Sequence, residues 1–388
     1  MKILITGGAG FIGNAIINEL SLDKNNDIIV LDALTEQIHG KEPENSYLYK
    51  GIVDKCDFVR GDIRDYQLVE QVVKNCDYII HLAAETGTGQ SMYKINQYNE
   101  VNIMGTSNLF QAISATGLKP DKFILASSRS VYGEGKYECS IHKIIYPGSR
   151  RSQNMETGDF NLHCPICNKV LHLLPTDEDS MINPISLYAF TKYAQERMVE
   201  TMCKAMQIDY TIFRFQNVYG IGQSLNNPYT GILSIFSTLL LDNKKVNVFE
   251  DGAESRDFIN VRDIASMVIK SLNENKVNQE IINLGSGVGT SVLAIAELLK
   301  RLYGSKSEIC VTEDFRIGDI AHNIADISKA ERLLGFRPQI SLEDGLKNFT
   351  TWVKGQYFDN NSYETSLKEM EQTGMFIRKK IGNKESIL

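Results

Sequence analysis

The stretch that decides the fold is the first one, MKILITGGAGFIG at residues 1–13. KILIT is typical of a short buried strand, and Gly7, Gly10 and Gly13 follow it at G-x-x-G-x-x-G spacing, where a helical pattern begins. Glycines in this position let the backbone approach a pyrophosphate, which lies at the positive N-terminus of the helix. The alternative is a glycine-rich turn in an unrelated α/β fold. The strand before the turn and the helix after it favour a dinucleotide site.

Asp32 ends the next predicted strand, DIIVLD at residues 27–32. A carboxylate about 20 residues beyond the glycine turn can accept hydrogen bonds from both ribose hydroxyls and would repel a 2′-phosphate. The predicted cofactor is therefore NAD rather than NADP. Asp62, in GDIRD after the third strand, is expected to face the adenine, although an aspartate before a helix is also a common N-cap.

Short apolar runs alternate with amphipathic helical patterns along most of the chain, and the later predicted strands are DYIIHLAA, KFILASS, DYTIFRF and EIINLG. This alternation predicts the α/β class: a Rossmann, doubly wound parallel sheet with a smaller C-terminal substrate-binding lobe. Residues 134–180 break the rhythm and form a long insertion. We assign residues 1–221 and 258–287 to the NAD-binding domain, 222–257 and 288–355 to the second lobe, and 356–388 to a C-terminal tail that is loosely ordered at NKESIL.

The composition is that of an ordinary globular protein, with 388 residues of which 43% are hydrophobic and 23% charged. A net charge of −7 argues against general nucleic-acid binding, because phosphate affinity needs a basic face. No run is long and apolar enough to span a bilayer, and Lys2 leads into a strand rather than a signal peptide. We therefore expect a cytoplasmic protein with no nucleic-acid or membrane partner, in which the seven cysteines form no disulfide framework.

YAFTK places Tyr188 and Lys192 four residues apart, on one face of a predicted helix. A free phenol has a pKa of about 10 and is a poor base at neutral pH. A neighbouring ammonium and a cationic nicotinamide ring would favour the phenolate and lower that pKa. Tyr188 would then be able to take a hydroxyl proton while hydride leaves the same carbon. Tyr-x-x-x-Lys also occurs by chance, and its position after the glycine turn is what favours catalysis.

The motifs of this sequence occur in an order that resembles that of a known family. TGGAGFIG, Asp32, GDIRD, HLAAETG, SSRSVYG, YAFTK, RFQNVYG and RDFINVRD make the sequence resemble the extended short-chain dehydrogenases/reductases, in their NAD-dependent nucleotide-sugar epimerase/dehydratase branch. More narrowly, AAETGTGQSMY and the Cys-rich insertion resemble the dTDP-L-rhamnose 4-epimerase subgroup. The resemblance implies a nucleotide-diphosphate sugar as substrate and a homodimer built through two helices. It also implies that Ser128 steadies the sugar oxygen beside Tyr188.

The same resemblance implies further contacts, position by position. The cofactor contacts would be Gly7, Gly10, Phe11, Ile12, Gly13, Asp32, Asp62, Ile63, Leu82, Ala83, Ala84, Tyr188 and Lys192. The substrate contacts would be Thr86 and Ser130 near the sugar, and Asn217, Arg256 and Arg316 at the diphosphate, which a guanidinium fork suits well. For Arg256 and Arg316 the alternative is a plain surface ion pair.

The two residues after Ser128 separate the activities within this branch. The 4,6-dehydratases resemble one another in having Asp and then Glu there, which handle the proton and the water during elimination. Here the positions hold Arg129 and Ser130, and neither is a plausible general acid or base for that step. The expected activity is NAD-dependent 4-epimerisation, through transient oxidation at C4 and hydride return to the opposite face.

Two other activities stay open at this point. A nucleotide-sugar 4,6-dehydratase or 4-reductase would use the same catalytic residues, and a reductase is poorly separated from an epimerase by sequence. The alternative of another class is a non-catalytic NAD-sensing regulator, which the Tyr188–Lys192 pair disfavours.

The insertion contains a candidate metal site. Cys139 and His142 in ECSIH, and Cys164 and Cys167 in LHCPICNKV, supply three thiolates and one imidazole at spacings that suit tetrahedral zinc. Four protein ligands leave no position for water, so the ion would be structural and would stabilise a loop that is costly to order. His163 is a competing ligand. The alternative is that these cysteines are small apolar side chains.

Overall fold

The computed structural model describes residues 1–225, 227, 231–358 and 362–379. Its centre is a parallel sheet of seven strands in the order β13-β9-β5-β4-β1-β2-β3. The chain runs outward from β1 to β3 and then returns to β4 on the other side of β1, which is the doubly wound order. The predicted Rossmann α/β class is confirmed. The strands are β1 (Lys2–Thr6), β2 (Asp27–Asp32), β3 (Asp57–Arg60), β4 (Tyr78–His81), β5 (Lys122–Ser128), β9 (Asp209–Phe215) and β13 (Glu280–Leu284).

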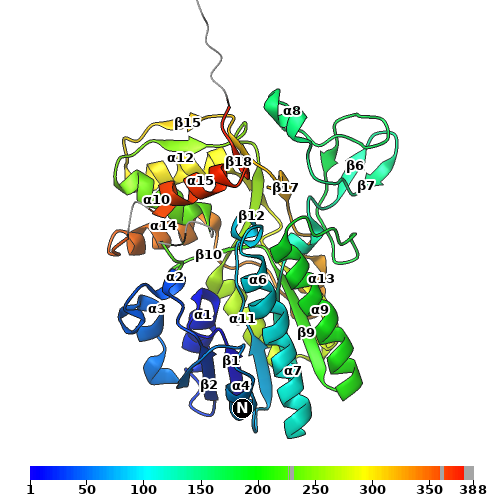
Figure 1. Ribbon diagram of the computed structural model, residues 1–388, viewed down its shortest axis with the longest axis vertical. Coiled ribbons are helices and arrows are strands. Elements are labelled where there is room, and N and C mark those ends of the chain that lie inside the picture. Colours follow the sequence, from blue (N-terminus) through cyan, green and yellow to red (C-terminus); the bar gives the residue numbers. More distant parts are fainter. Residues whose placement is uncertain (226, 228–230, 359–361, 380–388) are drawn as a thin grey trace, which may run out of the picture.

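Helices cover both faces of this sheet (Figure 1). On one face lie α1 (Phe11–Leu20), α11 (Val261–Leu272) and α13 (Ser328–Leu334), and on the other α4 (Tyr66–Val72), α7 (Gly105–Thr116) and α9 (Leu187–Met206). Shorter turns connect them: α2 (Glu36–His39), η1 (Pro43–Asn45), α3 (Tyr47–Lys50), η2 (Val53–Lys55), α5 (Thr88–Ser91), α6 (Ile95–Tyr98), η3 (Asn99–Met104), η4 (Arg129–Tyr132) and η5 (Asn275–Val277). Within the described residues, no helix is long and apolar enough to cross a membrane.

The core explains why the strands are apolar almost throughout. Successive residues of a strand point to opposite faces, so Ile3 and Ile5 pack with α1 and α11, while Leu4 packs with α4 and α7. Because both faces are covered, the three central positions of β1 are apolar. The carboxyl ends of the strands, where polar residues return, point toward the second lobe.

The second lobe has a core of its own, around Phe236, Leu299 and Phe349. Its sheet contains β10 (Asn217–Tyr219), β12 (Ser255–Asn260), β14 (Gly289–Ser291) and β17 (His322–Asn323), and β11 (Val246–Val248) pairs with β15 (Ile309–Val311). The covering helices are α10 (Ile232–Leu241), α12 (Val292–Tyr303) and α14 (Leu342–Val353).

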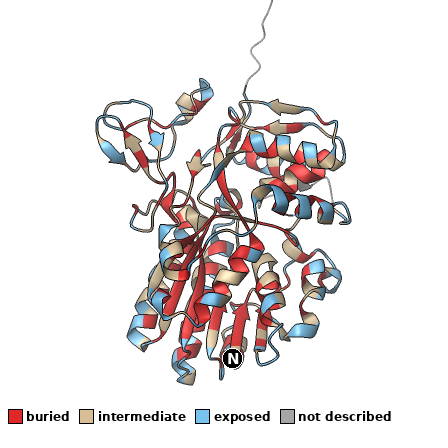
Figure 2. Cartoon of the chain, turned by 180° about the vertical axis from the view of Figure 1, so that it is seen from behind, coloured by how far each residue is buried: buried red, intermediate tan, exposed pale blue. Residues whose placement is uncertain are grey.

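The insertion stands apart from both lobes in Figure 1. It contains a small antiparallel sheet of β6 (Tyr137–Cys139), β7 (Lys143–Ile145) and β8 (His172–Leu173), and one short helix, α8 (Ser152–Glu156). Most of its ribbon is exposed or half-buried (Figure 2). Strands of two or three residues bury too little to be stable alone, so other contacts have to order this segment.

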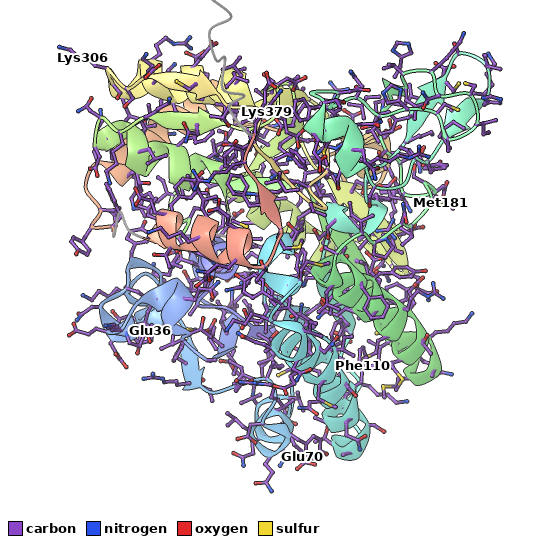
Figure 3. All side chains as sticks on the ribbon, turned by 45° about the horizontal axis from the view of Figure 1, so that its top comes forward. Glu36, Glu70, Phe110, Met181, Lys306 and Lys379 are labelled. Atoms are coloured by element: carbon purple, nitrogen blue, oxygen red, sulfur yellow. The ribbon has the colours of Figure 1, made fainter. Side chains whose placement is uncertain are left out.

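Residues 362–379 of the predicted C-terminal tail are folded onto the second lobe. They form α15 (Ser362–Gln372) and β18 (Phe376–Ile377), and β18 pairs with β16 (Phe315–Arg316) of the second lobe. Phe376 is buried against Phe249. Lys379 lies over the second lobe (Figure 3), where its N–H donates to the Asp314 carboxylate at 2.9 Å. These contacts are tertiary, so local composition gave no sign of them. NKESIL lies outside the described residues.

A buried ion pair fixes α9 to the sheet. The Glu196 carboxylate accepts two hydrogen bonds from Arg214, at 2.9 and 2.7 Å, and one from the Ser127 hydroxyl at 2.5 Å. Arg214 also donates to the Tyr132 hydroxyl at 2.8 Å. Both charged side chains are almost fully buried. The orientation of α9, which begins with the YAFTK motif, therefore depends on Glu196.

We expect Glu196→Gln to lower the free energy of unfolding by about 3–5 kcal/mol, because it leaves the Arg214 guanidinium buried with no counter-charge. Urea denaturation followed by circular dichroism would measure the change. The control is Glu200→Gln one turn later, whose pair with the exposed Arg197 should contribute about 0–1 kcal/mol. Equal effects of the two substitutions would contradict this account of α9.

Candidate active site

A cavity of about 580 Å³ opens at the carboxyl ends of β1, β2, β4 and β5. It is bounded by the loops of the large sheet, by the start of α9 and by the residues that follow β9. Almost every site residue expected from the sequence lines it: Gly7, Gly10, Phe11, Ile12, Gly13, Asp32, Asp62, Ile63, Leu82, Ala83, Ala84, Thr86, Ser128, Ser130, Tyr188, Lys192 and Asn217.

The glycine turn needs its glycines for steric reasons. Gly7 has a φ of +70°, and a Cβ there would lie 2.6 Å from the Ala83 nitrogen. A Cβ at Gly13 would lie 2.6 Å from the Gly8 Cα. Gly10 is the N-cap of α1 and has no side chain that could cap it, so the first N–H groups of the helix are left for a ligand. The geometry is that of a pyrophosphate site.

Asp32 lies beside this turn. Its carboxylate accepts hydrogen bonds from the Ala9 N–H at 2.9 Å and the Leu34 N–H at 2.8 Å. Burial raises the pKa of Asp32 above its usual value, and these N–H groups together with that of Gly10 offset this only in part. His39 lies 4.0 Å away, and burial lowers its pKa to about 4, so it is a neutral neighbour. The Asp32 carboxyl lines the cavity, where it can contact a ribose.

Asp62 is paired within the protein. Arg64 donates to its carboxylate from Nη2 at 2.7 Å and from Nε at 3.0 Å, and this contact lowers the pKa of Asp62. The N-cap of α4 is Asp65, whose side chain accepts from the Leu68 N–H. Asp62 is thus not the helix cap considered as its alternative, and it lines the cavity as an ion pair with Arg64.

Tyr188 and Ser128 meet at the other end of the cavity. α9 starts at the Ser186 N-cap, and the Tyr188 N–H donates to the Ser91 hydroxyl at 3.0 Å. Burial raises the pKa of Tyr188 above its usual value, and a hydrogen bond with Ser128 and the charge of Arg129 offset this only in part. The phenol and the Ser128 hydroxyl are therefore placed to contact one substrate oxygen together.

Lys192 has a different environment from the one expected. Its Nζ donates to the Ala126 carbonyl at 2.9 Å, and burial lowers its pKa to about 7. Arg129, which lines the same cavity, is the cation whose charge opposes the rise in the pKa of Tyr188. Sequence reasoning had treated Arg129 only as the replacement of an acid. No local pattern could show which cation approaches the phenol.

Several buried polar atoms around the cavity have no partner within the described residues. They are Arg129 Nη1, Ser130 Oγ, Asn217 Oδ1, both amide atoms of Gln216 and Gln223 Oε1, and all of these residues line the cavity. Buried polar groups are normally hydrogen-bonded, so this set indicates a polar ligand. Gln216 and Gln223 were missed from the sequence. The only signal was the position of Gln216 beside Asn217 in RFQNVYG.

Arg256 and Arg316 lie outside the lining of the cavity. Arg256 is buried, and its Nη1 donates to the carbonyls of Ala321 at 2.8 Å and Ser255 at 2.9 Å. The Arg316 guanidinium lies 5.1 Å from the centre of the Phe249 ring. The structure therefore rejects a plain surface ion pair for Arg256. The diphosphate role of both arginines stays a prediction.

The four predicted metal ligands converge. Their ligand atoms all lie within 4.8 Å of one another, with the Cys139 sulfur 3.6 Å from the Cys167 sulfur and from His142 Nδ1. Cys164 Sγ lies 3.4 Å from the same nitrogen. Tetrahedral zinc with bonds of about 2.3 Å to sulfur and about 2.0 Å to nitrogen would separate its ligands by about 3.5–3.8 Å. The cluster fits such an ion.

His163 does not compete for this cluster. Its Nε2 contacts the Asp159 carboxylate at 2.7 Å, and its Nδ1 contacts the Asn168 carbonyl at 3.0 Å. Both ring nitrogens are thus engaged by groups outside the cluster. This removes the one alternative ligand that the sequence had suggested.

The sheet order, the glycine turn at its switch point and the cavity beside it define a Rossmann-type dinucleotide-binding fold. The model of the NAD dependent epimerase/dehydratase family matches residues 3–151 and 166–285. The chain belongs to this family of extended short-chain dehydrogenases/reductases.

Individual relatives agree with this assignment. The chain is 37% identical to a dTDP-L-rhamnose 4-epimerase of Burkholderia thailandensis, over 91% of this chain and 94% of the relative. It is similar to the solved UDP-glucuronic acid 4-epimerase of Bacillus cereus in complex with UDP-glucuronic acid and NAD, with a TM-score of 0.75, 26% identity and coverage of 92% and 100%. A UDP-glucose 4-epimerase of Thermotoga maritima, solved with UDP-glucose, gives a TM-score of 0.73, 28% identity and coverage of 91% and 99%. Together with the family, the NAD complex supports NAD as the cofactor.

We expect Asp32→Asn to narrow the preference for NAD over NADP by at least about tenfold, the equivalent of about 1.4 kcal/mol, because it removes the charge that repels a 2′-phosphate. Isothermal titration with each dinucleotide would measure the two affinities. The control is Asp27→Asn at the exposed start of β2. An unchanged ratio in Asp32→Asn would show that the discrimination lies elsewhere.

Proposed function

We propose that the protein is an NAD-dependent nucleotide-sugar 4-epimerase. The observation that carries the proposal is the placement of Ser128 and Tyr188 at one end of the cavity and of the glycine turn at the other. Such a cavity can hold a dinucleotide along the strand ends with its reactive ring near the phenol. Relatives that are named 4-epimerases support the same activity.

The residues suggest how each proton would move. When bound, NAD would supply the acceptor and then the donor of hydride. Tyr188, as phenolate, would take the proton of the C4 hydroxyl while Ser128 holds that oxygen by a hydrogen bond. The same phenol would return the proton when the ketone is reduced on its opposite face. Oxidation and reduction cancel, so the reaction needs no external oxidant or reductant.

The two residues after Ser128 disfavour dehydration. Elimination of water needs a proton donor for the leaving oxygen and a base at the neighbouring carbon. Arg129 is a buried guanidinium and Ser130 a hydroxyl, and neither supplies such a pair. The similarity to an enzyme named for L-rhamnose, a 6-deoxy sugar, is consistent with this, since such a sugar has no C6 oxygen to lose. We therefore place 6-deoxyhexose nucleotides first among the candidate substrates.

The Tyr188→Phe variant tests the proposed epimerase activity. We expect kcat to fall by about 10²–10⁴-fold, the usual contribution of a general acid–base group, while bound NAD is retained. Wild-type protein would first be incubated with UDP-, dTDP-, GDP- and CDP-sugars and the products resolved by NMR. Tyr193→Phe on the same helix is the matched control, since Tyr193 does not line the cavity. Release of a 4-keto sugar in bulk, or turnover by Tyr188→Phe, would refute the proposal.

We also propose that Cys139, His142, Cys164 and Cys167 hold a structural zinc ion. We expect about one zinc per chain by mass spectrometry. Cys164→Ser combined with Cys167→Ser should release the metal and expose residues 134–180 to proteolysis, because metal binding contributes to local folding. Cys310→Ser, outside the insertion, should keep the metal. Purified protein without zinc would refute this proposal.

The predicted homodimer and the cytoplasmic location stay predictions. Exposed apolar side chains on neighbouring segments support an association surface: Met92, Ile95 and Phe190 surround one shallow hollow. Light scattering would give the oligomeric state directly.

A further inference from the structure

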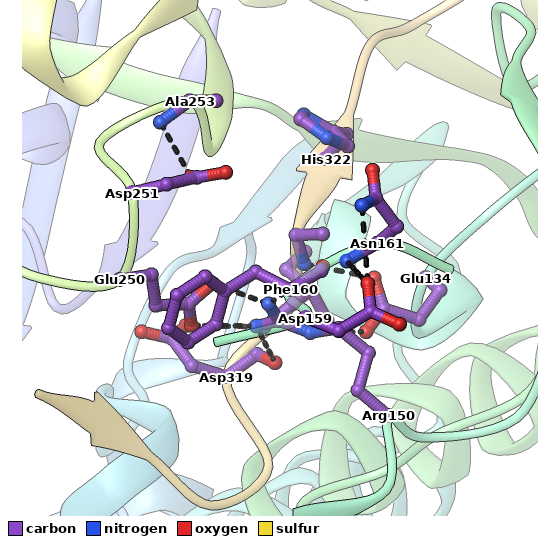
Figure 4. Close-up of polar contacts among 12 residues, drawn as sticks. Glu134, Arg150, Asp159, Phe160, Asn161, Glu250, Asp251, Ala253, Asp319 and His322 are labelled. Carbon is purple, nitrogen blue, oxygen red and sulfur yellow. Dashed lines mark hydrogen bonds and ion pairs between the residues drawn. The ribbon is translucent and has the colours of Figure 1, made fainter. Parts of the chain in front are cut away.

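A buried ion cluster joins the insertion to the second lobe. The Arg150 guanidinium, from the insertion just before α8, lies between Glu134, Glu250 and Asp319 (Figure 4). Both of its terminal nitrogens donate to the Glu250 carboxylate, Nη2 at 2.8 Å, and Nη2 also donates to the Asp319 carbonyl at 2.9 Å. Its Nε lies 3.6 Å from Glu134. Arg150 thus contacts the start of the insertion at Glu134 and two segments of the second lobe, at Glu250 and Asp319.

The insertion touches the same part of the second lobe in two further places. Ala321 packs into the small core of the insertion, which contains Cys139 and Cys164. Phe160 packs against Phe315 of β16, just before the loop of residues 317–321. The loop of residues 317–321, between β16 and β17, is therefore held at both ends and in the middle by the insertion.

The 317–321 loop in turn holds Arg256. The Ala321 N–H donates to Glu134 at 2.8 Å, and the Ala321 carbonyl accepts from Arg256 Nη1 at 2.8 Å. Arg256 Nη2 lies 3.5 Å from the Asp319 carboxylate. A continuous set of contacts therefore leads from Arg150 to Arg256, the arginine for which the sequence predicts a contact with the diphosphate.

The charges in this region suit an anionic group. Partial burial raises the pKa of Asp319, and yet the pKa lies below its usual value because of the charges of Arg256, Arg316, Arg150 and Arg129. Four arginines thus act on one carboxylate here, and a guanidinium fork suits a diphosphate.

We propose that Arg150 is a positioning residue for the nucleotide diphosphate of the substrate, because it fixes the loop that holds Arg256, the predicted diphosphate contact. The proposal rests on the function proposed above. The insertion, with its cysteine and histidine cluster, would then contribute to substrate binding. Arg150 itself would not touch the substrate.

A purely stabilising role would give a different result. Loss of a buried partner leaves Glu250 and Glu134 without compensation, which can destabilise the fold as a whole. General destabilisation would weaken NAD and nucleotide binding together. Displacement of Arg256 would weaken only the binding of the diphosphate, since the glycine turn and Asp32 have no contact with this cluster.

The test compares Arg150→Met with Arg151→Met in the full-length, NAD-loaded protein. Arg151 is the exposed neighbour, so the control removes the same charge from the same segment. Titration calorimetry with UDP and with dTDP is the readout, together with the amount of NAD retained. We expect Arg150→Met to weaken nucleoside diphosphate binding by about 10–100-fold, a range typical of groups that orient a ligand-binding side chain, with NAD unchanged. For a turned-over nucleotide sugar, KM should rise by a similar factor while kcat changes little.

Arg150→Lys keeps the test decisive if Arg150→Met does not fold. A lysine keeps the charge beside Glu250 but lacks the fork that bridges Glu250 and the Asp319 carbonyl. We expect it to fold and to bind nucleoside diphosphates with an affinity between those of Arg150→Met and the wild type. Wild-type affinity in both variants would overturn the positioning role. If the wild type itself binds neither UDP nor dTDP, the titration is repeated with GDP and CDP, and binding of none of the four refutes the proposed function instead, so the two failures are distinguishable.

The metal cluster should act on the same loop. Cys164→Ser is therefore expected to weaken nucleoside diphosphate binding too, and its effect should not add to that of Arg150→Met, because both changes release residues 317–321. Fully additive effects would show that the cluster and Arg150 act on different elements, and would overturn this part of the inference.

Discussion

The close approach of the Gly7 turn to the backbone after β4 is the contact on which the site depends. Only glycine tolerates both the left-handed φ at this position and a neighbouring backbone nitrogen 2.6 Å from where a Cβ would lie. The chain reverses its direction across the sheet between β1 and β4, so their carboxyl ends leave an open crevice. The turn and the segment after β4 line that crevice together. The cavity is thus a consequence of strand order, and its chemistry comes from the side chains that surround it.

One face of α9 brings much of that chemistry. Tyr188, Lys192 and Glu196 succeed one another at intervals of four residues, so the phenol, the ammonium and the anchoring carboxylate share a side of the helix. Burial lowers the pKa of Lys192 to about 7, although Glu196 opposes this. The Lys192 Nζ donates to the Ala126 carbonyl. Arg129, which follows β5, is the cation whose charge opposes the rise in the pKa of Tyr188.

The sequence predicted what local pattern controls. The strand bounds of KILIT, DIIVLD and KFILASS agree with the structure residue for residue, because buried parallel strands are apolar on both faces. The glycine turn and the Tyr188–Lys192 pair were found for a similar reason, since their spacing is short. The folded end of the chain, the partners of Arg256 and the role of Arg129 were not found. Each depends on contacts between residues far apart in sequence, which no periodicity records.

The insertion shows how these two kinds of information combine. Its spacing revealed the cysteine and histidine cluster, but only the structure shows that Cys139 and Cys164 share a core with Ala321 of the second lobe. That core is too small to order a long segment by hydrophobic burial alone. A metal ion bound in this core and the buried guanidinium of Arg150 would both stabilise the insertion. Because both contacts end on the loop that holds Arg256, whatever stabilises the insertion also fixes the position of that arginine.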